Sequence, residues 1–185
     1  MGFLSKEVLD SMGFKSLGEN VLISDKASIY NPKNISLGSN IRIDDFCILS
    51  AGEKGIELGD YIHIACYVSL IGNELIKLHD FVGISSKTAV YSSSDDYSGN
   101  FLTGPTINNK FKNVDNRPVI FHTHSLIGAG VIILPGVEIG EGTAVGAMSL
   151  VSKSLEEWSI YSGVPAKFIK KRSKKMLTLV NEINK

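Results

Sequence analysis

Two adjacent carboxylates, Asp95 and Asp96, lie in a polar segment, YSSSDD, that spans residues 91–96. A carboxylate with an ordinary pKa of about 3.9 is a poor base for an alcohol near pH 7. It can still hold an ammonium group, accept its proton or orient the free amine. The residue types in this segment therefore suit chemistry on nitrogen better than chemistry on a hydroxyl group.

Other side chains suited to acyl or phosphate chemistry lie on either side of this segment. The Ser85 hydroxyl could donate a hydrogen bond to a developing oxyanion. One good donor of that kind stabilises the transition state by about 2.7–4 kcal/mol. A serine that simply satisfies a turn is an equally good interpretation of Ser85. Lys167 and Lys170 lie beside Gly-Val-Pro-Ala, residues 163–166, and are suited to phosphates as point charges.

A six-residue rhythm governs the elements that must position these side chains. In VIILPGVEIGEGTAVG, residues 131–146, aliphatic residues recur at Val131 and Val137 and again at Ile133 and Ile139. A helix repeats at 3.6 residues and a strand at two. A period of six fits neither alone, but it fits the short strands and turns of a parallel β-helix.

A longer unit, apolar-x-apolar-Gly-x-x-apolar-x-apolar, extends this rhythm along the chain, with His in place of Gly in two copies. It begins at Ile35, Ile56, Ile76, Val119 and Val137. The last two starts are 18 residues apart, which corresponds to one triangular coil. The start at Val119 follows Ile76 by 43 residues, so about 25 residues must leave the coil, and we predict an inserted loop at residues 92–118.

The two ends of the chain follow other patterns. Residues 1–20 are expected to form a short helix, capped by Ser5, and a lead-in to the coils. Residues 21–163 form the predicted β-helix domain, and residues 164–185 form a C-terminal part. A helix is predicted there over residues 168–184, with Phe168, Met176, Leu177 and Val180 on its apolar face. The expected fold class is all-β with these two helices and one protruding loop.

Composition argues against several classes of function. The 185 residues include 19 basic and 19 acidic side chains, which argues against nucleic acid as a partner. The sequence has no apolar run of about 18 residues and no signal-peptide pattern, so membrane insertion is not expected. Cys47 and Cys66 fit a reducing cytoplasm better than a disulfide framework.

The chain resembles the left-handed β-helix acyltransferases, the hexapeptide-repeat family, over about residues 21–172. The most specific stretch is LIGAGVIILPGVEIGEGTAVGAMSLVSKSLEEWSIYSGVPAKFIKK, residues 126–171, which carries the repeat, a Val-Ser-Lys segment and the Gly-Val-Pro-Ala exit. The resemblance implies left-handed coils, a homotrimer with active sites between subunits, and acetyl-CoA as the donor.

Residues 91–119 most resemble bacterial N-acyltransferases that act on dTDP-linked amino sugars, such as the anthrose-pathway enzyme. This resemblance implies N-acetylation of a nucleotide-linked amino sugar, with dTDP-4-amino-4,6-dideoxyglucose as the expected acceptor, in the cytoplasmic assembly of a surface polysaccharide. The base of the nucleotide, the position of the amine and the length of the acyl group stay open.

Stacked in register, the repeats place two columns of residues at one corner of the prism. They are Asp44, Ala65, Ser85, Gly128 and Gly146, followed by Asp45, Cys66, Ser86, Ala129 and Ala147. The C-terminal half of these columns is small, so it exposes backbone amides and leaves room for a thin chain such as pantetheine. Small residues are also common at tight corners for structural reasons alone. The resemblance implies CoA contacts at Ala129, Ala147, Ser152, Lys153, Lys167 and Lys170, and the register of the small corner adds Gly128 and Gly146.

Asp95 occupies the place where many sugar O-acetyltransferases of this fold carry a catalytic histidine. A neutral imidazole can take a proton from a hydroxyl nucleophile, and a carboxylate suits an amine instead. We therefore expect Asp95 to hold or deprotonate the amine and Ser85 to bind the oxyanion. Asp95 could otherwise be an ordinary polar loop residue.

The histidines raise two further hypotheses. By register His63 points outward beside the polar half of the corner, where it and Asp44 could bind the sugar nucleotide. His79 and His122 occupy equivalent positions and His124 lies two residues on, so a metal site like that of the γ-carbonic anhydrases is conceivable. Their spacing does not match the ligand set of that family, and we expect no metal.

The predicted loop carries candidate acceptor contacts. Asp96, Asn100 and Lys110 could meet the sugar nucleotide, and its large apolar residues could pack on a neighbouring subunit. Packing without ligand contact is an equally good interpretation of Asn100 and Lys110, whereas Asp96 is more often a solvated residue or a turn former. Two other functions remain compatible with the sequence: an O-acetyltransferase for a sugar or antibiotic hydroxyl, and a non-catalytic trimeric scaffold or metal-binding relative.

Overall fold

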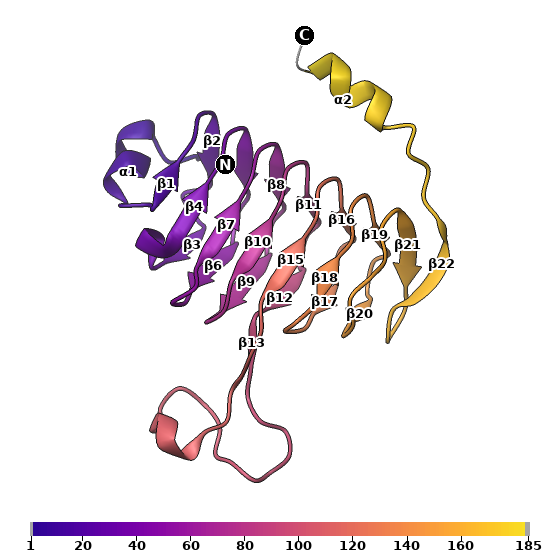
Figure 1. Ribbon diagram of the computed structural model, residues 1–185. Coiled ribbons are helices and arrows are strands. Elements are labelled where there is room, and N and C mark those ends of the chain that lie inside the picture. The colour runs from indigo at the N-terminus through magenta and orange to yellow at the C-terminus, as the bar shows by residue number, and fades with distance from the viewer. Residues whose placement is uncertain (1, 184–185) are drawn as a thin grey trace.

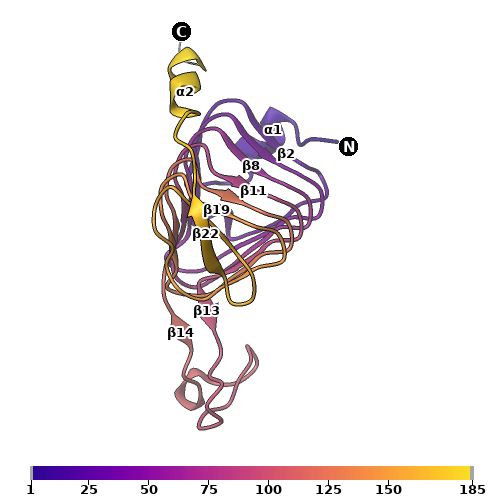
Figure 2. The same cartoon turned by 90° about the vertical axis from the view of Figure 1, so that its right-hand side faces the viewer.

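The chain winds into a triangular prism of parallel strands, shown from the side in Figure 1 and turned by 90° in Figure 2. The computed structural model describes residues 2–183. Three sheets form the three sides, and successive coils stack along the axis because each strand pairs with its equivalents in the coils before and after it. The predicted fold, a left-handed parallel β-helix, is confirmed.

The first sheet has six strands. They are β1 (Ser16–Leu17), β4 (Ile35–Leu37), β7 (Ile56–Leu58), β10 (Ile76–Leu78), β15 (Val119–Phe121) and β18 (Glu138–Ile139). The second sheet has eight strands: β2 (Val21–Ile23), β5 (Ile41–Ile43), β8 (Ile62–Ile64), β11 (Gly83–Ile84), β16 (Leu126–Ile127), β19 (Ala144–Val145), β21 (Ser159–Ser162) and β22 (Lys167–Lys171).

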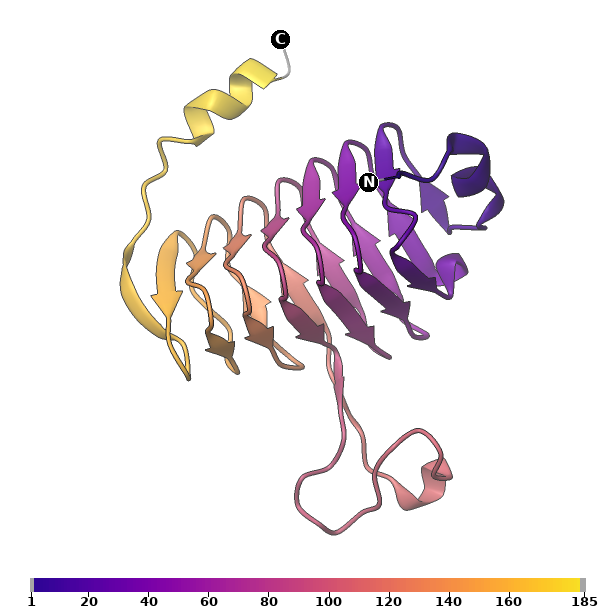
Figure 3. The same ribbon diagram turned by 180° about the vertical axis from the view of Figure 1, so that it is seen from behind.

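The third sheet again has six strands, and it faces the viewer in Figure 3. They are β3 (Ser28–Tyr30), β6 (Ile48–Ala51), β9 (Ser69–Gly72), β12 (Ala89–Tyr91), β17 (Ile132–Ile133) and β20 (Leu150–Val151). The remaining elements are α1 (Lys6–Ser11), η1 (Pro32–Asn34), η2 (Asn109–Phe111), α2 (Leu177–Ile183) and the small hairpin β13 (Ser93–Ser94) and β14 (Asp115–Asn116).

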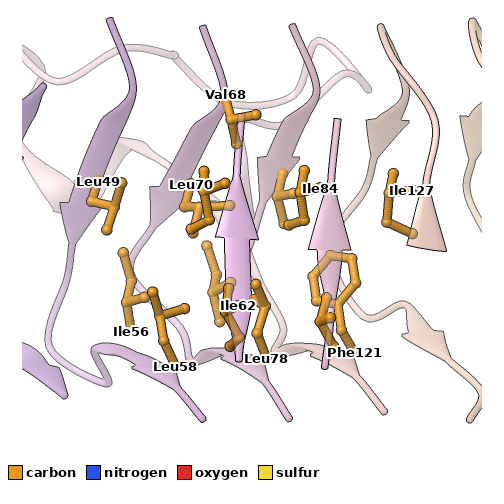
Figure 4. Close-up of a cluster of buried hydrophobic side chains, with 14 of the residues drawn as sticks. Leu49, Ile56, Leu58, Ile62, Val68, Leu70, Leu78, Ile84, Phe121 and Ile127 are labelled. Carbon is orange, nitrogen blue, oxygen red and sulfur yellow. The ribbon is translucent and has the colours of Figure 1, made fainter. Parts of the chain in front are cut away.

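The core is a stack of aliphatic side chains along the axis, part of which is drawn in Figure 4. Ile43, Ile64, Ile84 and Ile127 pair in register in the second sheet, and each is at most 1% exposed. Because strand residues alternate between faces, the two aliphatic positions of each hexad point inward. Burial of one such side chain contributes about 1.5–3 kcal/mol to the stability of the fold, and every coil adds further side chains of this kind.

Aromatic rings stack along the corner between the first and second sheets. Tyr61, Phe81 and His124 all have backbone φ angles near +60°. Such angles cost non-glycine residues energy. Their ring centroids are 4.7 and 5.0 Å apart, close to the spacing of neighbouring strands, so each coil places one ring directly on the next.

The predicted loop leaves after β12 and returns at β15, as expected from the interval in the repeat. It projects away from the prism beyond the hairpin of β13 and β14 (Figure 1). The Ser5 cap is also confirmed, because its hydroxyl accepts a hydrogen bond from the Val8 amide at 3.4 Å.

The C-terminal helix prediction was wrong over its first half. Residues 167–171 form β22, which runs antiparallel to β21, and helix α2 begins only at Leu177. The run Lys-Phe-Ile-Lys-Lys can form backbone hydrogen bonds with the open edge of the last coil. This pairing outweighs the weak helical preference of the segment. Asn184, the last residue of the predicted helix, lies outside the described residues.

Candidate active site

The two predicted columns meet at the corner between the second and third sheets, hereafter the Ser85 corner. The Asp44 amide donates to Ile64 O, the Ala65 amide to Ile84 O, and the Ser85 amide to Ile127 O. These bonds join equivalent residues of successive coils, so the register read from the sequence is the register of the structure.

Asp44 is the most tightly held residue in the polar half of the Ser85 corner. Its Oδ1 accepts a hydrogen bond from Arg42 Nε at 2.7 Å, and its Oδ2 lies 2.9 Å from His63 Nε2. Burial raises the pKa of Asp44, but the bonds from Arg42 and His63 outweigh it and lower the pKa below its ordinary value. His63 itself is exposed and faces outward, as predicted, and lies opposite Arg42 in the sheet.

Ser85 and His63 border the same hollow in the outer face of the second sheet. The hollow has a volume of about 230 Å³ and is lined by His63, Ala65, Gly83, Ser85, Ser86 and Leu126. Ser85 is half-buried. A group bound there would meet the hydroxyls of two serines, one imidazole and an otherwise small, partly apolar wall.

The small half of the Ser85 corner is more tightly stacked than the sequence implied. A Cβ atom added to Gly128 would lie 2.6 Å from the Ala147 amide nitrogen and 2.8 Å from Val145 O. The Gly128 amide donates to Val145 O and the Gly146 amide to Tyr161 O. The expectation of free amides at these two glycines was therefore wrong, and the surface available to a thin ligand is formed by Ala129 and Ala147, which are exposed.

The predicted lysines lie at two different places. Lys167 pairs with Ser162, and Ser162 stacks on Gly146, so Lys167 ends the Ser85 corner. Lys170 lies on β22 like Lys167 and pairs with Ile160 of β21. Both lysines are exposed. Ser152 and Lys153 instead follow β20 in the third sheet, at the corner from which the loop projects. A single chain therefore does not bring the whole predicted CoA set together.

The loop presents Asp95 to solvent. Asp95 Oδ1 accepts a hydrogen bond from the Gly104 amide at 3.4 Å, and the residue borders a hollow of about 360 Å³ together with Pro105, Lys112 and Val114. Ser85 and Asp95 thus line separate hollows, one at the Ser85 corner and one on the loop.

Asp96 has a structural role in the loop. Its Oδ1 accepts hydrogen bonds from the Ser98 amide and hydroxyl, and its Oδ2 accepts one from Asn113 at 3.3 Å. The Ser98 hydroxyl bond is the largest cause of a lowered pKa of Asp96. Asn100 and Lys110 are exposed, and Lys110 Nζ lies 4.7 Å from the centre of the Phe111 ring.

The other histidines do not converge. His79 and His122 stack with ring centres 5.4 Å apart, and His122 Nε2 lies 3.2 Å from Glu138 Oε2. His124 is buried in the stack with Phe81. Across residues 2–183, no three His, Cys, Asp or Glu side chains gather closely enough to hold a metal ion. Within that same range, no helix is long and apolar enough to cross a bilayer.

Sequence reasoning missed two features of this site. Arg42 holds Asp44 from the side opposite His63, and its place two residues before Asp44 and level with His63 was available from the register. The hollow between His63 and Leu126 was not readable from the repeat, because Gly83 fills an ordinary strand position.

These features define a hexapeptide-repeat acyltransferase: left-handed coils, one inserted loop, and a corner that is polar at one end and small at the other. None of the protein-family profiles matches the chain. The chain is 49% identical to the dTDP-4-amino-4,6-dideoxy-D-glucose acyltransferase of Escherichia coli over 97% of its length and 93% of the relative's. It therefore belongs to the family of dTDP-4-amino-4,6-dideoxy-D-glucose acyltransferases.

Two further proteins, one a solved structure and one a more distant relative, are also similar to this chain. The N-acyltransferase AntD from Bacillus cereus, solved in complex with dTDP and 3-hydroxybutyryl-CoA, superposes with a TM-score of 0.94 at 55% identity, over 98% of this chain and 96% of that one. A putative lipopolysaccharide biosynthesis O-acetyl transferase, WbbJ of Escherichia coli K12, is 31% identical over 80% of this chain and 74% of its own. The predicted enzyme class, a CoA-dependent N-acyltransferase of a dTDP-linked amino sugar, is confirmed by the family.

Proposed function

We propose that this protein transfers an acyl group from a CoA thioester to the 4-amino group of dTDP-4-amino-4,6-dideoxyglucose. The observation that carries the proposal is the near full-length identity of 49% to an acyltransferase named for that sugar. A carboxylate in place of a histidine on the loop supports nitrogen rather than oxygen as the nucleophile. The O-acetyltransferase alternative has the weaker support of a 31% identical relative.

We assign Ser85 and Asp95 as the catalytic residues. AntD has been solved as variants of one serine and of one aspartate, which are ten residues apart in that chain. Ser85 and Asp95 have the same separation here. This match of residue types and spacing supports both assignments.

In the proposed reaction Asp95 accepts a proton from the 4-ammonium group, which frees the nitrogen lone pair to attack the thioester carbonyl. Ser85 Oγ–H donates a hydrogen bond to the oxyanion as the C–N bond forms. The C–S bond then breaks, and the second proton lost from nitrogen goes to the sulfur. The products are the amide and free CoA, and Asp95 returns its proton to solvent.

The donor and acceptor would occupy opposite ends of the Ser85 corner. The exposed surface of Ala129 and Ala147 suits the narrow pantetheine arm, and Lys167 and Lys170 suit the CoA phosphates. Asp44 borders the other end, where it could hold the sugar nucleotide, and His63 lies between the sugar and the acyl group. Asp96, Asn100 and Lys110 belong to this proposal only as loop contacts to the nucleotide.

We further propose that the active unit is a homotrimer whose sites lie between subunits. The outer face of the third sheet carries Ile48, Ile71 and Ile132, and Ile132 is 44% exposed. The outer face of the first sheet is charged instead, with Lys77 paired to Glu57 at 3.0 Å. The loop also exposes Tyr97 by 93% and Leu102 by 57%, which a neighbouring subunit would cover.

Such an assembly would bring the loop of one subunit to the Ser85 corner of another. It would also carry Ser152 and Lys153 of one subunit to the donor end of the next. We place the enzyme in the cytoplasm, in the assembly of a surface polysaccharide, because nucleotide-linked sugars and CoA thioesters are both cytoplasmic building blocks.

The activity is tested by measuring thiol release from acetyl-CoA when dTDP-4-amino-4,6-dideoxyglucose is added. Asp95→Ala should lower kcat at least about tenfold, because the amine loses its proton acceptor. Asp95→Asn, which keeps the shape of the side chain, should lower kcat by a similar factor. Asp10→Ala, at an exposed carboxylate on α1, is the matched control. No release from the wild-type protein with any nucleotide-linked amino sugar would refute the function.

The shared site is tested by mixing two inactive proteins, Ser85→Ala and Asp95→Ala, under conditions that allow subunit exchange. A site built from two subunits would regain up to about a quarter of the wild-type rate, since each mixed trimer contains some intact pairs. Sites confined to one chain would regain nothing. Sedimentation of the wild-type protein at the mass of three chains is the accompanying measurement.

A further inference from the structure

Gly83 occupies a strand position that usually carries a side chain. It lies in β11 on the outer face of the second sheet, paired with His63 on one side and Leu126 on the other. Glycine weakens a strand, and in a strand it often marks a place where another group approaches closely. Both neighbours in this row are large, so Gly83 leaves a gap between them.

Neither backbone geometry nor stacking explains this glycine. Its φ angle lies outside the left-handed region, so its conformation is open to other residues. A Cβ atom at Gly83 would meet only the flexible end of Leu126, at 3.3 Å. At Gly38 and Gly128, by contrast, an added Cβ would approach backbone atoms of the next coil to 2.6 Å. Those glycines are needed for stacking, and Gly83 is not.

The gap forms part of the hollow of about 230 Å³ described above, hereafter the Gly83 hollow. A water molecule takes about 30 Å³ of liquid, so the hollow has far more room than one methyl group needs. Residues two apart on a strand share a face. Ser85 therefore borders the same hollow, next to the position where the thioester carbonyl would lie.

We propose that the Gly83 hollow receives the acyl chain of the donor, and that the missing side chain at Gly83 admits chains longer than acetyl. The inference rests on the proposed function and extends it to donor selectivity. With its carbonyl oxygen at Ser85, an acyl chain would extend over Gly83 between His63 and Leu126.

The polarity of the hollow favours a particular class of chain. Leu126 is 45% exposed and offers an apolar wall. His63 Nε2 is engaged by Asp44 Oδ2 at 2.9 Å, which fixes the ring and leaves Nδ1 for another partner. A short acyl chain with a hydroxyl group fits this combination best, because the chain would pack on Leu126 while the hydroxyl bonds to His63.

The test compares kcat/KM for acetyl-CoA, butyryl-CoA and 3-hydroxybutyryl-CoA with dTDP-4-amino-4,6-dideoxyglucose as the acceptor. Gly83→Val should lower kcat/KM for the two longer donors by about tenfold or more relative to acetyl-CoA, because it removes room for the added carbons. Gly83→Ala should shift the ratio in the same direction by less. Leu126→Ala should shift it the opposite way, and Ser36→Val, on the outer face of the first sheet, should leave it unchanged.

A donor ratio that stays constant in Gly83→Ala, Gly83→Val and Leu126→Ala would overturn the inference. An increase in KM for the sugar nucleotide that is equal for all three donors would also overturn it, since the hollow would then hold the acceptor. If Gly83→Val does not fold, as judged by its thermal unfolding, the other two variants decide. Failure of wild-type protein to use any donor would refute the proposed function instead.

Discussion

The two halves of the Ser85 corner share one backbone and differ only in their side chains. In the N-terminal half, Asp44 is fixed by Arg42 and His63, and Ser85 borders an open hollow. In the C-terminal half, Gly128 and Gly146 lie so close to the next coil that a Cβ atom would collide with it. One half therefore supplies functional groups, and the other supplies a bare surface.

This difference shows how a repeat fold can hold two unlike substrates side by side. The ladder hydrogen bonds of the corner are the same from Asp44 to Gly146, so the framework contributes equally to both halves. Selectivity then depends on a few outward positions of each coil. The following predictions test that separation of roles, beginning with the largest expected effect.

Ser85→Ala should reduce kcat by about 10²–10³-fold with little change in either KM, because the hydroxyl acts mainly on the oxyanion of the transition state. Single-turnover measurements of thiol release would show the loss. Ser125→Ala is the matched control. Ser125 stands directly before β16, and its buried hydroxyl has no hydrogen-bond partner within residues 2–183, so its loss should not lower the rate. A Ser85→Ala enzyme of normal kcat would remove Ser85 from the mechanism.

Gly128→Ala should destabilise the fold by about 1–3 kcal/mol, because the new Cβ would press on backbone atoms that cannot move cheaply. For a chain of this length that corresponds to a Tm lower by roughly 2–12 °C. Ala65→Ser, which enlarges the equivalent residue in the polar half, is the comparison and should be tolerated. Equal effects of the two substitutions on Tm would contradict the distinction between the halves.

Lys167→Ala and Lys170→Ala should each raise KM for acetyl-CoA by about tenfold or more and leave KM for the sugar nucleotide unchanged, since each removes a charged contact at the donor end. Added salt should weaken binding in the wild-type protein more than in these variants. Lys15→Ala, before the first strand of the β-helix, is the control. A rise in KM for the acceptor instead would place the donor at the other end of the corner.

Asp44→Asn should have the smallest effect, a loss of stability of about 1 kcal/mol or less at neutral pH. The pKa of Asp44 is lowered in the folded state, so its contribution is present above the unfolded pKa of about 3.9 and disappears as pH falls through the lower folded value. Denaturant unfolding at several pH values should therefore show wild type and variant converging in acid. Asp10→Asn should show no such convergence.

Much of the fold was predictable because the repeat is a local signal. The period of six, the start of each unit at Ile35, Ile56 and Ile76, and the long interval before Val119 were enough for the coils, their register and the loop. The C-terminal strand was not predictable in the same way. Residues 167–171 pair with β21 only because the last coil leaves an open edge, and that edge exists only in the folded chain.

The candidate site likewise has features that the repeat predicts and features that depend on the folded chain. The sequence determined by itself the contents of the Ser85 corner, since counting through the repeat aligns Asp44, Ser85 and Gly128. Only the tertiary structure decided that the amides of Gly128 and Gly146 are used by the next coil, that Asp96 fastens a turn, and that Gly83 leaves a hollow beside Ser85. The reason is that periodicity specifies which residues stack, whereas side-chain orientation and neighbouring atoms decide which of them are left for a ligand.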